Sequence, residues 1–139
     1  MKTNLGPEDL GDLLEQPLIG VLATRREDDT TLLSPVWWDW RDGRFSIWAD
    51  SEENGKIRHI RRDPRVSFVV ANQDWPYKGL EVRGTATIST DDFYGVLART
   101  ARRFMGAEAE ARMVASTPRG VVIRIEPTVV RGWDYVDEA

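Results

Sequence analysis

The sequence of 139 residues contains no cysteine and only one histidine, His59. Without cysteine the chain has no disulfides, no thiolate metal sites and no cysteine nucleophile. A single histidine cannot build a multi-histidine metal site, and it leaves little room for a serine–histidine–aspartate triad. We therefore predict no metal-binding residue and no catalytic acid–base constellation. His59 itself lies among basic residues and is expected to be a surface histidine.

Lysine is also rare, and long hydrophobic runs are absent. Lysine occurs only at Lys2, Lys56 and Lys78, which makes each of these positions conspicuous. The longest apolar run covers residues 18–23, which is far too short to cross a bilayer. The N-terminus does not show the charged, apolar and small-residue regions of a signal peptide. We expect a cytoplasmic protein with no membrane partner.

The composition is that of an ordinary soluble globule. Hydrophobic residues make up 41% and charged residues 30% of the chain, and the length suits a single domain over residues 1–139. The formal net charge of −4 argues against general nucleic-acid binding. No nucleic-acid partner is therefore predicted, although the basic segment after residue 55 leaves a nucleic-acid binder as a minor alternative.

Period-two alternation and turn residues predict a mainly β fold with flanking helices. The expected strands cover residues 18–25, 32–40, 45–50, 66–71, 80–88 and 120–126, with residues 129–133 continuing the last one past Pro127. The expected helices are a short one between Pro7 and Pro17, one capped by Asp50 or Ser51 and stopped by Pro64, and two more over residues 91–104 and 107–115. The first of these two, over residues 91–104, carries an apolar stripe that is typical of core packing. Sequential hairpins of this kind favour a closed or nearly closed antiparallel barrel.

Several motifs, in this order, give the chain a resemblance to a known family. They are GVLATRREDDTTLLSPVWWDW, RDGRFSIWAD, GKIRHIRRDPRVSFVV and YKGLEVRGTATI, followed by a helical insert and a last strand that ends in RGWDY. On these residues the chain resembles the FMN-binding split-barrel superfamily, the pyridoxamine 5'-phosphate oxidase-like proteins. Within that superfamily it looks most like the small members that use the deazaflavin coenzyme F420. The most specific element is the run from Lys56 to Val66, with Asp63-Pro64 inside it.

The resemblance implies a six-stranded antiparallel split β-barrel that forms a homodimer with cofactor sites at the interface. It implies an oxidoreductase that passes a hydride from reduced F420 to an electron-poor small molecule such as a quinone, an enone or a biliverdin-like tetrapyrrole. Two alternatives stay open: an FMN-dependent oxidase or reductase on the same fold, and a non-catalytic module that binds flavin or haem.

Lys56 is the first candidate binding residue. The resemblance implies that it contacts the cofactor phosphate, with help from Ser51 and from the strand end at Ala49 and Asp50. A cation beside the free N–H groups of a helix start suits an anion. Arg61 is the next candidate on the same helix. The alternative is that this helix presents a solvated basic face.

The tryptophan-rich strand is the second candidate region. The resemblance implies that the cofactor ring lies beside Pro35, Val36, Trp37 and Trp38, with Trp48 on the paired strand as a further neighbour. Strand alternation puts Val36, Trp38 and Trp40 on one face and Trp37 and Asp39 on the other. Packing in the core or in a dimer interface is the alternative for these side chains.

The aromatic turn at residues 75–78 is the third candidate region. The resemblance implies that Tyr77 and Lys78 reach the cofactor bound to the partner subunit. The alternative is a capped hairpin loop without a binding role.

Overall fold

The computed structural model describes all 139 residues, which form one antiparallel sheet and three helices. The strands are β1 (Lys2–Leu5), β2 (Gly20–Arg25), β3 (Thr31–Val36), β4 (Asp39–Arg41), β5 (Arg44–Ala49), β6 (Arg65–Ala71), β7 (Lys78–Ser89) and β8 (Val121–Asp134). The helices are α1 (Gly55–Arg62), α2 (Phe93–Met105) and α3 (Ala107–Ser116), with single 3-10 turns at Pro7–Asp9, Leu13–Glu15 and Val136–Glu138. None of the helices is long and apolar enough to span a membrane.

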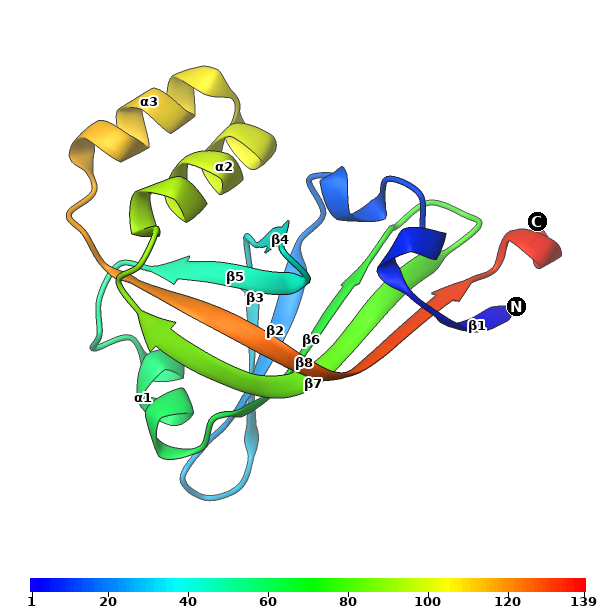
Figure 1. Cartoon of the computed structure of the whole chain (residues 1–139), viewed down its shortest axis with the longest axis horizontal. Helices are drawn as coiled ribbons and strands as arrows, with labels where there is room; N and C mark the ends of the chain where they lie inside the picture. Colours follow the sequence, from blue (N-terminus) through cyan, green and yellow to red (C-terminus); the bar gives the residue numbers. More distant parts are fainter.

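The strands follow the order β3-β2-β6-β7-β8-β5-β4, and β1 pairs with the far end of β8. The long strands β7 and β8 form the centre of the sheet, which curls into a half-barrel (Figure 1). Helix α1 and the α2–α3 pair lie on opposite sides of β5, while the two termini meet at the other end of the molecule (Figure 1). The predicted split barrel with flanking helices is thus confirmed, although it has eight strands rather than six.

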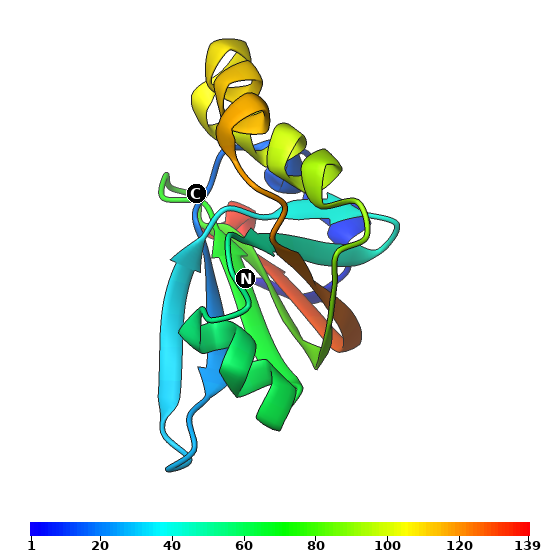
Figure 2. The same cartoon turned by 90° about the vertical axis from the view of Figure 1, so that its left-hand side faces the viewer.

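A two-residue link bridges the opening of the barrel. Strand β3 pairs only with β2, and β4 pairs only with β5, so the two strands are the opposite ends of the sheet path. Trp37 and Trp38 connect them directly, and the chain turns there from one sheet edge to the other (Figure 2). The prediction of one continuous strand over residues 32–40 was therefore wrong. The physical reason is that Trp38 turns into the core, where its indole N–H donates to the Leu18 carbonyl oxygen at 2.6 Å.

The last strand continues past Pro127, as the sequence predicts. Arg83 lies opposite Val129 and Gly84 opposite Pro127, so Thr128 is an extra residue that forms a bulge. Its hydroxyl donates to the Arg83 carbonyl oxygen at 3.1 Å. Because proline lacks an N–H, the bulge is where the ladder accommodates it.

The core fills the inside of the curled sheet. Its largest fully buried side chains include Trp38, Phe45 and Phe68. Helix α1 covers one side through Ile57 and Ile60. A second cluster joins α2 to β8, and its buried members are Phe93, Val96, Leu97 and Val122. The predicted core-packing role of the apolar stripe on α2 is confirmed.

Two expected helical features differ from the structure. The segment between Pro7 and Pro17 contains two 3-10 turns in place of one helix, because Gly11 adopts a φ of +60° between them. Helix α1 is capped by Asn54, whose side chain accepts the Lys56 backbone N–H at 3.2 Å. Neither Asp50 nor Ser51 caps it, because a turn over residues 51–54 separates the end of β5 from the helix.

Candidate functional site

An open apolar pocket of about 360 Å³ lies beside the link between the two sheet edges. Its lining residues are Ile19, Pro35, Val36, Trp37, Trp48 and Met113. Four of the six are residues that the sequence predicts beside a cofactor ring: Pro35, Val36, Trp37 and Trp48. Val36 and Trp37 line the same pocket although strand alternation assigns them to opposite faces, because the strand ends at Val36.

The two indoles of the pocket are held by helix α2. Trp37 stacks on Phe104, with ring centroids 5.4 Å apart and an interplanar angle of 6°. The indole N–H of Trp48 donates to the Thr100 hydroxyl at 3.1 Å. The two indoles meet each other at 6.5 Å and 62°, in an edge-on arrangement. The pocket therefore has a fixed aromatic wall rather than free side chains.

The side chain of Trp38 lies away from the pocket. It is fully buried in the core, where it packs edge-on against Phe45 and Phe68. Any ligand contact of this residue is therefore confined to its backbone. Packing is the structural role of Trp38.

Lys56 lies in the first turn of α1 and is half-buried. Its ammonium donates to the Asn54 Oδ1 atom at 3.2 Å, and it takes part in no ion pair. Burial lowers the pKa of Lys56, and the nearby charge of Asp50 opposes that shift. A partly desolvated ammonium with only one neutral acceptor is well suited to an added anion.

A short stretch of chain leads from the aromatic wall to this cation. After Trp48, Ala49 ends β5 in a buried position opposite Val121, and Asp50 is exposed. The Ser51 hydroxyl oxygen accepts the Glu53 backbone N–H at 3.0 Å, which shapes the turn before α1. The strand end, the turn and the helix start thus follow one another along the segment that the sequence predicts to bind phosphate.

Three other predicted residues lie elsewhere. Arg61 is exposed and pairs with Glu52 at 2.6 Å, so it already has an anionic partner. Lys78 is the first residue of β7 and Tyr77 precedes it, and this start of the strand lies at the end of the molecule away from α1 (Figure 1). Within one chain they are therefore not brought together with Lys56.

The loop before β7 forms an exposed aromatic surface. Trp75 is 52% and Tyr77 47% exposed, and their rings meet edge-on at 5.3 Å. Trp75 also contacts Tyr135 at 5.9 Å. A hollow of about 470 Å³ beside this loop is lined in part by Trp75 and Lys78.

His59 is half-buried rather than a free surface histidine. Its Nδ1 atom lies 3.2 Å from the hydroxyl oxygen of Thr24, a buried residue of β2. Burial lowers the pKa of His59, and the charges of Arg26, Arg62 and Arg58 lower it further. The lowered pKa favours the neutral imidazole at this position of α1.

Sequence reasoning missed the contributions of the helical insert and of the segment before β2. Met113 of α3 and Ile19 line the pocket, and Thr100 and Phe104 of α2 hold its indoles. The spacing of four between Thr100 and Phe104 places both on one helix face, which was a usable signal. Their aromatic partners are distant in sequence and had no such signal.

Comparisons with known proteins agree with this architecture. The family model described as pyridoxamine 5'-phosphate oxidase matches residues 7–134. A conserved hypothetical protein from Mycobacterium tuberculosis is similar in structure, with a TM-score of 0.82 and 25% sequence identity over 96% of this chain and 88% of that chain. A protein described as an F420 reductase is similar with a TM-score of 0.72 and 30% identity, over 90% of this chain and 98% of that chain. An FAD-binding protein from Mycobacterium smegmatis shares the fold, with a TM-score of 0.63 and 19% identity over 94% of this chain and 95% of that chain.

Proposed function

The chain belongs to the pyridoxamine 5'-phosphate oxidase family, and on that premise we propose that it uses coenzyme F420 to reduce an electron-poor small molecule by hydride transfer. One observation carries the proposal: three features follow one another along a single segment of the chain. They are an apolar pocket with an aromatic wall, the end of β5, and the half-buried Lys56, which has no carboxylate partner. The similarity to an F420 reductase over nearly the whole of that chain supports the choice of cofactor.

The residues present suit a ring-bearing phosphorylated cofactor. Lys56 would hold the phosphate, and the Ser51 hydroxyl and the backbone at Ala49 and Asp50 lie on the path towards it. The ring would rest in the pocket, against Trp37 and Trp48 and beside the backbone of residues 35–38. When bound, a reduced deazaflavin supplies the hydride, and the protein supplies position and shelter from water.

The pocket lining indicates the class of substrate. No titratable side chain lines the pocket, and five of its six residues are hydrophobic. Its volume of about 360 Å³ lies within the range of small-molecule sites. A flat, electron-poor acceptor such as a quinone, an enone or a biliverdin-like molecule would fit such walls, and the proton that completes its reduction would come from solvent.

A second copy of the chain is the partner that we propose for the outer face of the sheet. On β2, β3 and β6 this face carries Val21, Ala23, Leu33, Pro35 and Val69, which are neighbours by register. Leu33 is 63% exposed in the single chain. Burying this face in a homodimer would remove apolar surface from water. It would also allow Tyr77 and Lys78 of the partner subunit to approach the cofactor.

An FMN-dependent oxidase or reductase is the second candidate, because FMN shares the phosphate and the flat ring that the same residues would hold. A non-catalytic flavin- or haem-binding module is the third. The observation in its favour is that no titratable side chain lines the pocket to assist a reaction.

Fluorescence-monitored titration of the purified protein with F420 and with FMN tests these readings. We expect tight binding of F420, and oxidation of reduced F420 when a quinone, an enone or biliverdin is added. Tighter binding of FMN than of F420 would favour the second candidate, an FMN-dependent oxidase or reductase. Binding without turnover of any acceptor would favour the module, and binding of neither cofactor would refute both enzyme functions.

A further inference from the structure

A buried carboxylate ties helix α2 to the sheet edge beside the pocket. Asp39 is the first residue of β4, and its side chain is only 7% exposed. Its Oδ2 atom accepts the Nε–H of Arg99 at 2.7 Å. Arg99 also donates through Nη2 to Asp92 at 2.9 Å, so this guanidinium joins β4 to the residue that precedes α2.

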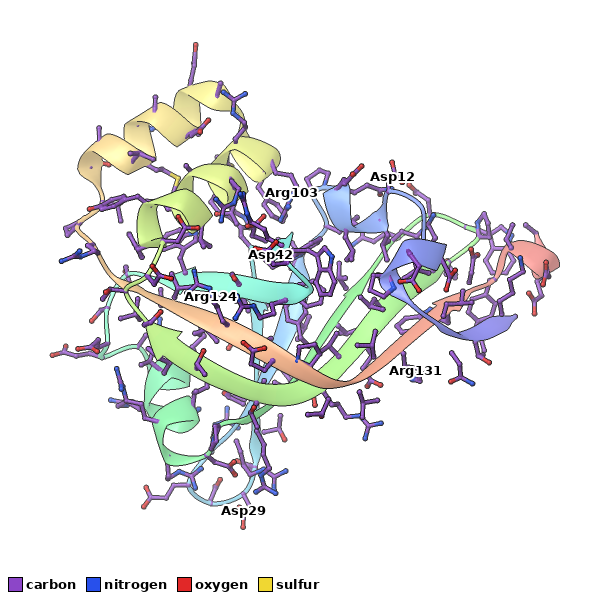
Figure 3. The ribbon with its side chains drawn as sticks, viewed as in Figure 1. Asp12, Asp29, Asp42, Arg103, Arg124 and Arg131 are labelled. Carbon is purple, nitrogen blue, oxygen red and sulfur yellow. The ribbon has the colours of Figure 1, made fainter.

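A second guanidinium approaches the same carboxylate from one helical turn further on. Arg103 lies with its Nη1 atom 3.8 Å from the Asp39 Oδ1 atom. Its Nε and Nη2 atoms are buried without a hydrogen-bond partner, and burial lowers the pKa of Arg103. Arg103 projects from α2 towards the aromatic side chains of the sheet, and its guanidinium carbon lies 4.4 Å from the centre of the Trp38 ring (Figure 3). Asp39 is the only carboxylate within 4.0 Å of the Arg103 guanidinium.

The same turn of α2 also holds the two indoles of the pocket. Arg99 and Arg103 face Asp39, while the residues that follow each of them, Thr100 and Phe104, contact Trp48 and Trp37. The hydroxyl of Thr100 is itself fixed, because it donates to the backbone of the preceding turn at 2.8 Å. A shift of this turn along β4 would therefore move both contacts of the aromatic wall together.

We propose that Asp39 is a positioning residue for the apolar pocket: it fixes the last two turns of α2, and these turns set the orientation of Trp37 and Trp48. The carboxylate does not line the pocket, so it acts through the helix and not through contact with a ligand. Its consequence for cofactor binding rests on the proposed function, whereas its effect on the indoles does not.

Fluorine NMR of protein labelled with fluorotryptophan tests the inference without a ligand. The chain gives one resonance for each of its six tryptophans, which single Trp→Phe variants assign. Asp39→Asn is expected to shift or broaden the Trp37 and Trp48 resonances and to leave that of Trp75, on the distant loop, unchanged. Arg99→Gln should produce the same pattern, and it keeps the test decisive if Asp39→Asn does not fold.

Arg44→Gln is the matched control. Arg44 lies on the same β4–β5 hairpin as Asp39, and the substitution removes its exposed ion pair with Glu126 of β8. It should leave the resonances of Trp37 and Trp48 in place. The inference is overturned if Arg99→Gln or a folded Asp39→Asn leaves both resonances unchanged. It is also overturned if all six resonances move together, since that would mean a general loosening of the fold.

Titration with F420 and FMN forms the second arm. Arg99→Gln is expected to weaken binding about tenfold through the displaced wall. Lys56→Ala should weaken binding without moving the Trp37 and Trp48 resonances. If the unaltered protein binds neither cofactor, the proposed function fails while the fluorine spectra still decide the role of Asp39. If it binds and Arg99→Gln binds equally well, the positioning role is refuted and the proposed function stands.

Discussion

The indole of Trp37 stacks on the phenyl ring of Phe104, with centroids 5.4 Å apart and planes 6° from parallel. Trp37 belongs to the link between the two sheet edges, and Phe104 to the last turn of α2. The contact therefore joins the opening of the barrel to the helical insert. The same phenyl ring meets Trp38 edge-on at 6.5 Å, but the side chain of Trp38, unlike that of Trp37, has no exposed surface.

Adjacent tryptophans should consequently respond differently to substitution. Trp38→Phe is expected to lower the free energy of unfolding by about 1–3 kcal/mol, because it leaves the Leu18 carbonyl without its donor and creates a cavity. Trp37→Leu should change stability less and weaken F420 or FMN binding about tenfold. Urea denaturation and cofactor titration of both variants would check this. Equal losses of stability and affinity in the two variants would contradict it.

Gly120 controls the strand end that leads to Lys56. A Cβ atom at this position would lie 2.0 Å from the Ala49 carbonyl oxygen, so Gly120→Ala must displace the end of β5. We expect a loss of about 1–3 kcal/mol in the free energy of unfolding. Gly55→Ala is the control. Gly55 is the first residue of α1, and the nearest atom to a Cβ at this position would be 4.0 Å away. This substitution should be neutral or stabilising by up to about 1 kcal/mol. Thermal denaturation compares the stabilities of the two variants. A Gly120→Ala protein as stable as the unaltered protein would mean that the end of β5 can move without cost.

His59 should make stability depend on pH. Its pKa in the folded protein is lowered, chiefly by burial, whereas the unfolded chain has an ordinary value of about 6.5. As pH falls below about 6.5, the unfolded state takes up a proton that the folded state resists, so the free energy of unfolding decreases. Urea denaturation between pH 7.5 and about 5 should show this decrease, and His59→Gln should make it shallower. An identical slope in the variant would contradict the neutral, half-buried imidazole.

The outer sheet face should control self-association. Leu33→Arg places a charge in the proposed interface and should convert the dimer to a monomer in light-scattering chromatography, with little change in the stability of the monomer since the side chain is 63% exposed. Val114→Arg is the control, because Val114 is an exposed apolar residue of α3 and does not belong to the strands β2, β3 and β6 that carry this face. A protein that stays dimeric in both variants would place the interface elsewhere, and a monomeric unaltered protein would refute the proposed homodimer.

Local patterns were sufficient to predict most of the fold. Alternation predicted β2, β5, β6 and β7, and Asp42-Gly43, a pair typical of tight hairpin turns, lies between β4 and β5. Strand β1 was missed, because its short exposed sequence has no apolar period and its pairing with β8 joins the two ends of the chain. The break after Val36 was missed because it depends on where Trp38 finds a buried partner, Leu18, which alternation alone cannot reveal.

The candidate site was likewise predictable only in part. Lys56 and the pocket residues Pro35, Val36, Trp37 and Trp48 follow from sequence motifs along one continuous segment. The anchoring of that segment by α2 could not be predicted from these motifs, because Asp39 and Arg99 are sixty residues apart and meet only in the folded chain. Long-range ion pairs of this kind leave no local periodicity in a single sequence.

The role of Lys56 is the central claim, and one comparison of affinities tests it most directly. F420 and FMN are titrated into the unaltered protein, Lys56→Ala and Arg58→Ala, the last of which removes an exposed charge from the same helix. The loss of a charge-assisted contact to phosphate, about 1.5–3 kcal/mol, should weaken binding to Lys56→Ala by about 10- to 150-fold. Arg58→Ala should bind nearly as tightly as the unaltered protein. Unchanged affinity in Lys56→Ala would contradict the account and leave α1 as a solvated basic helix.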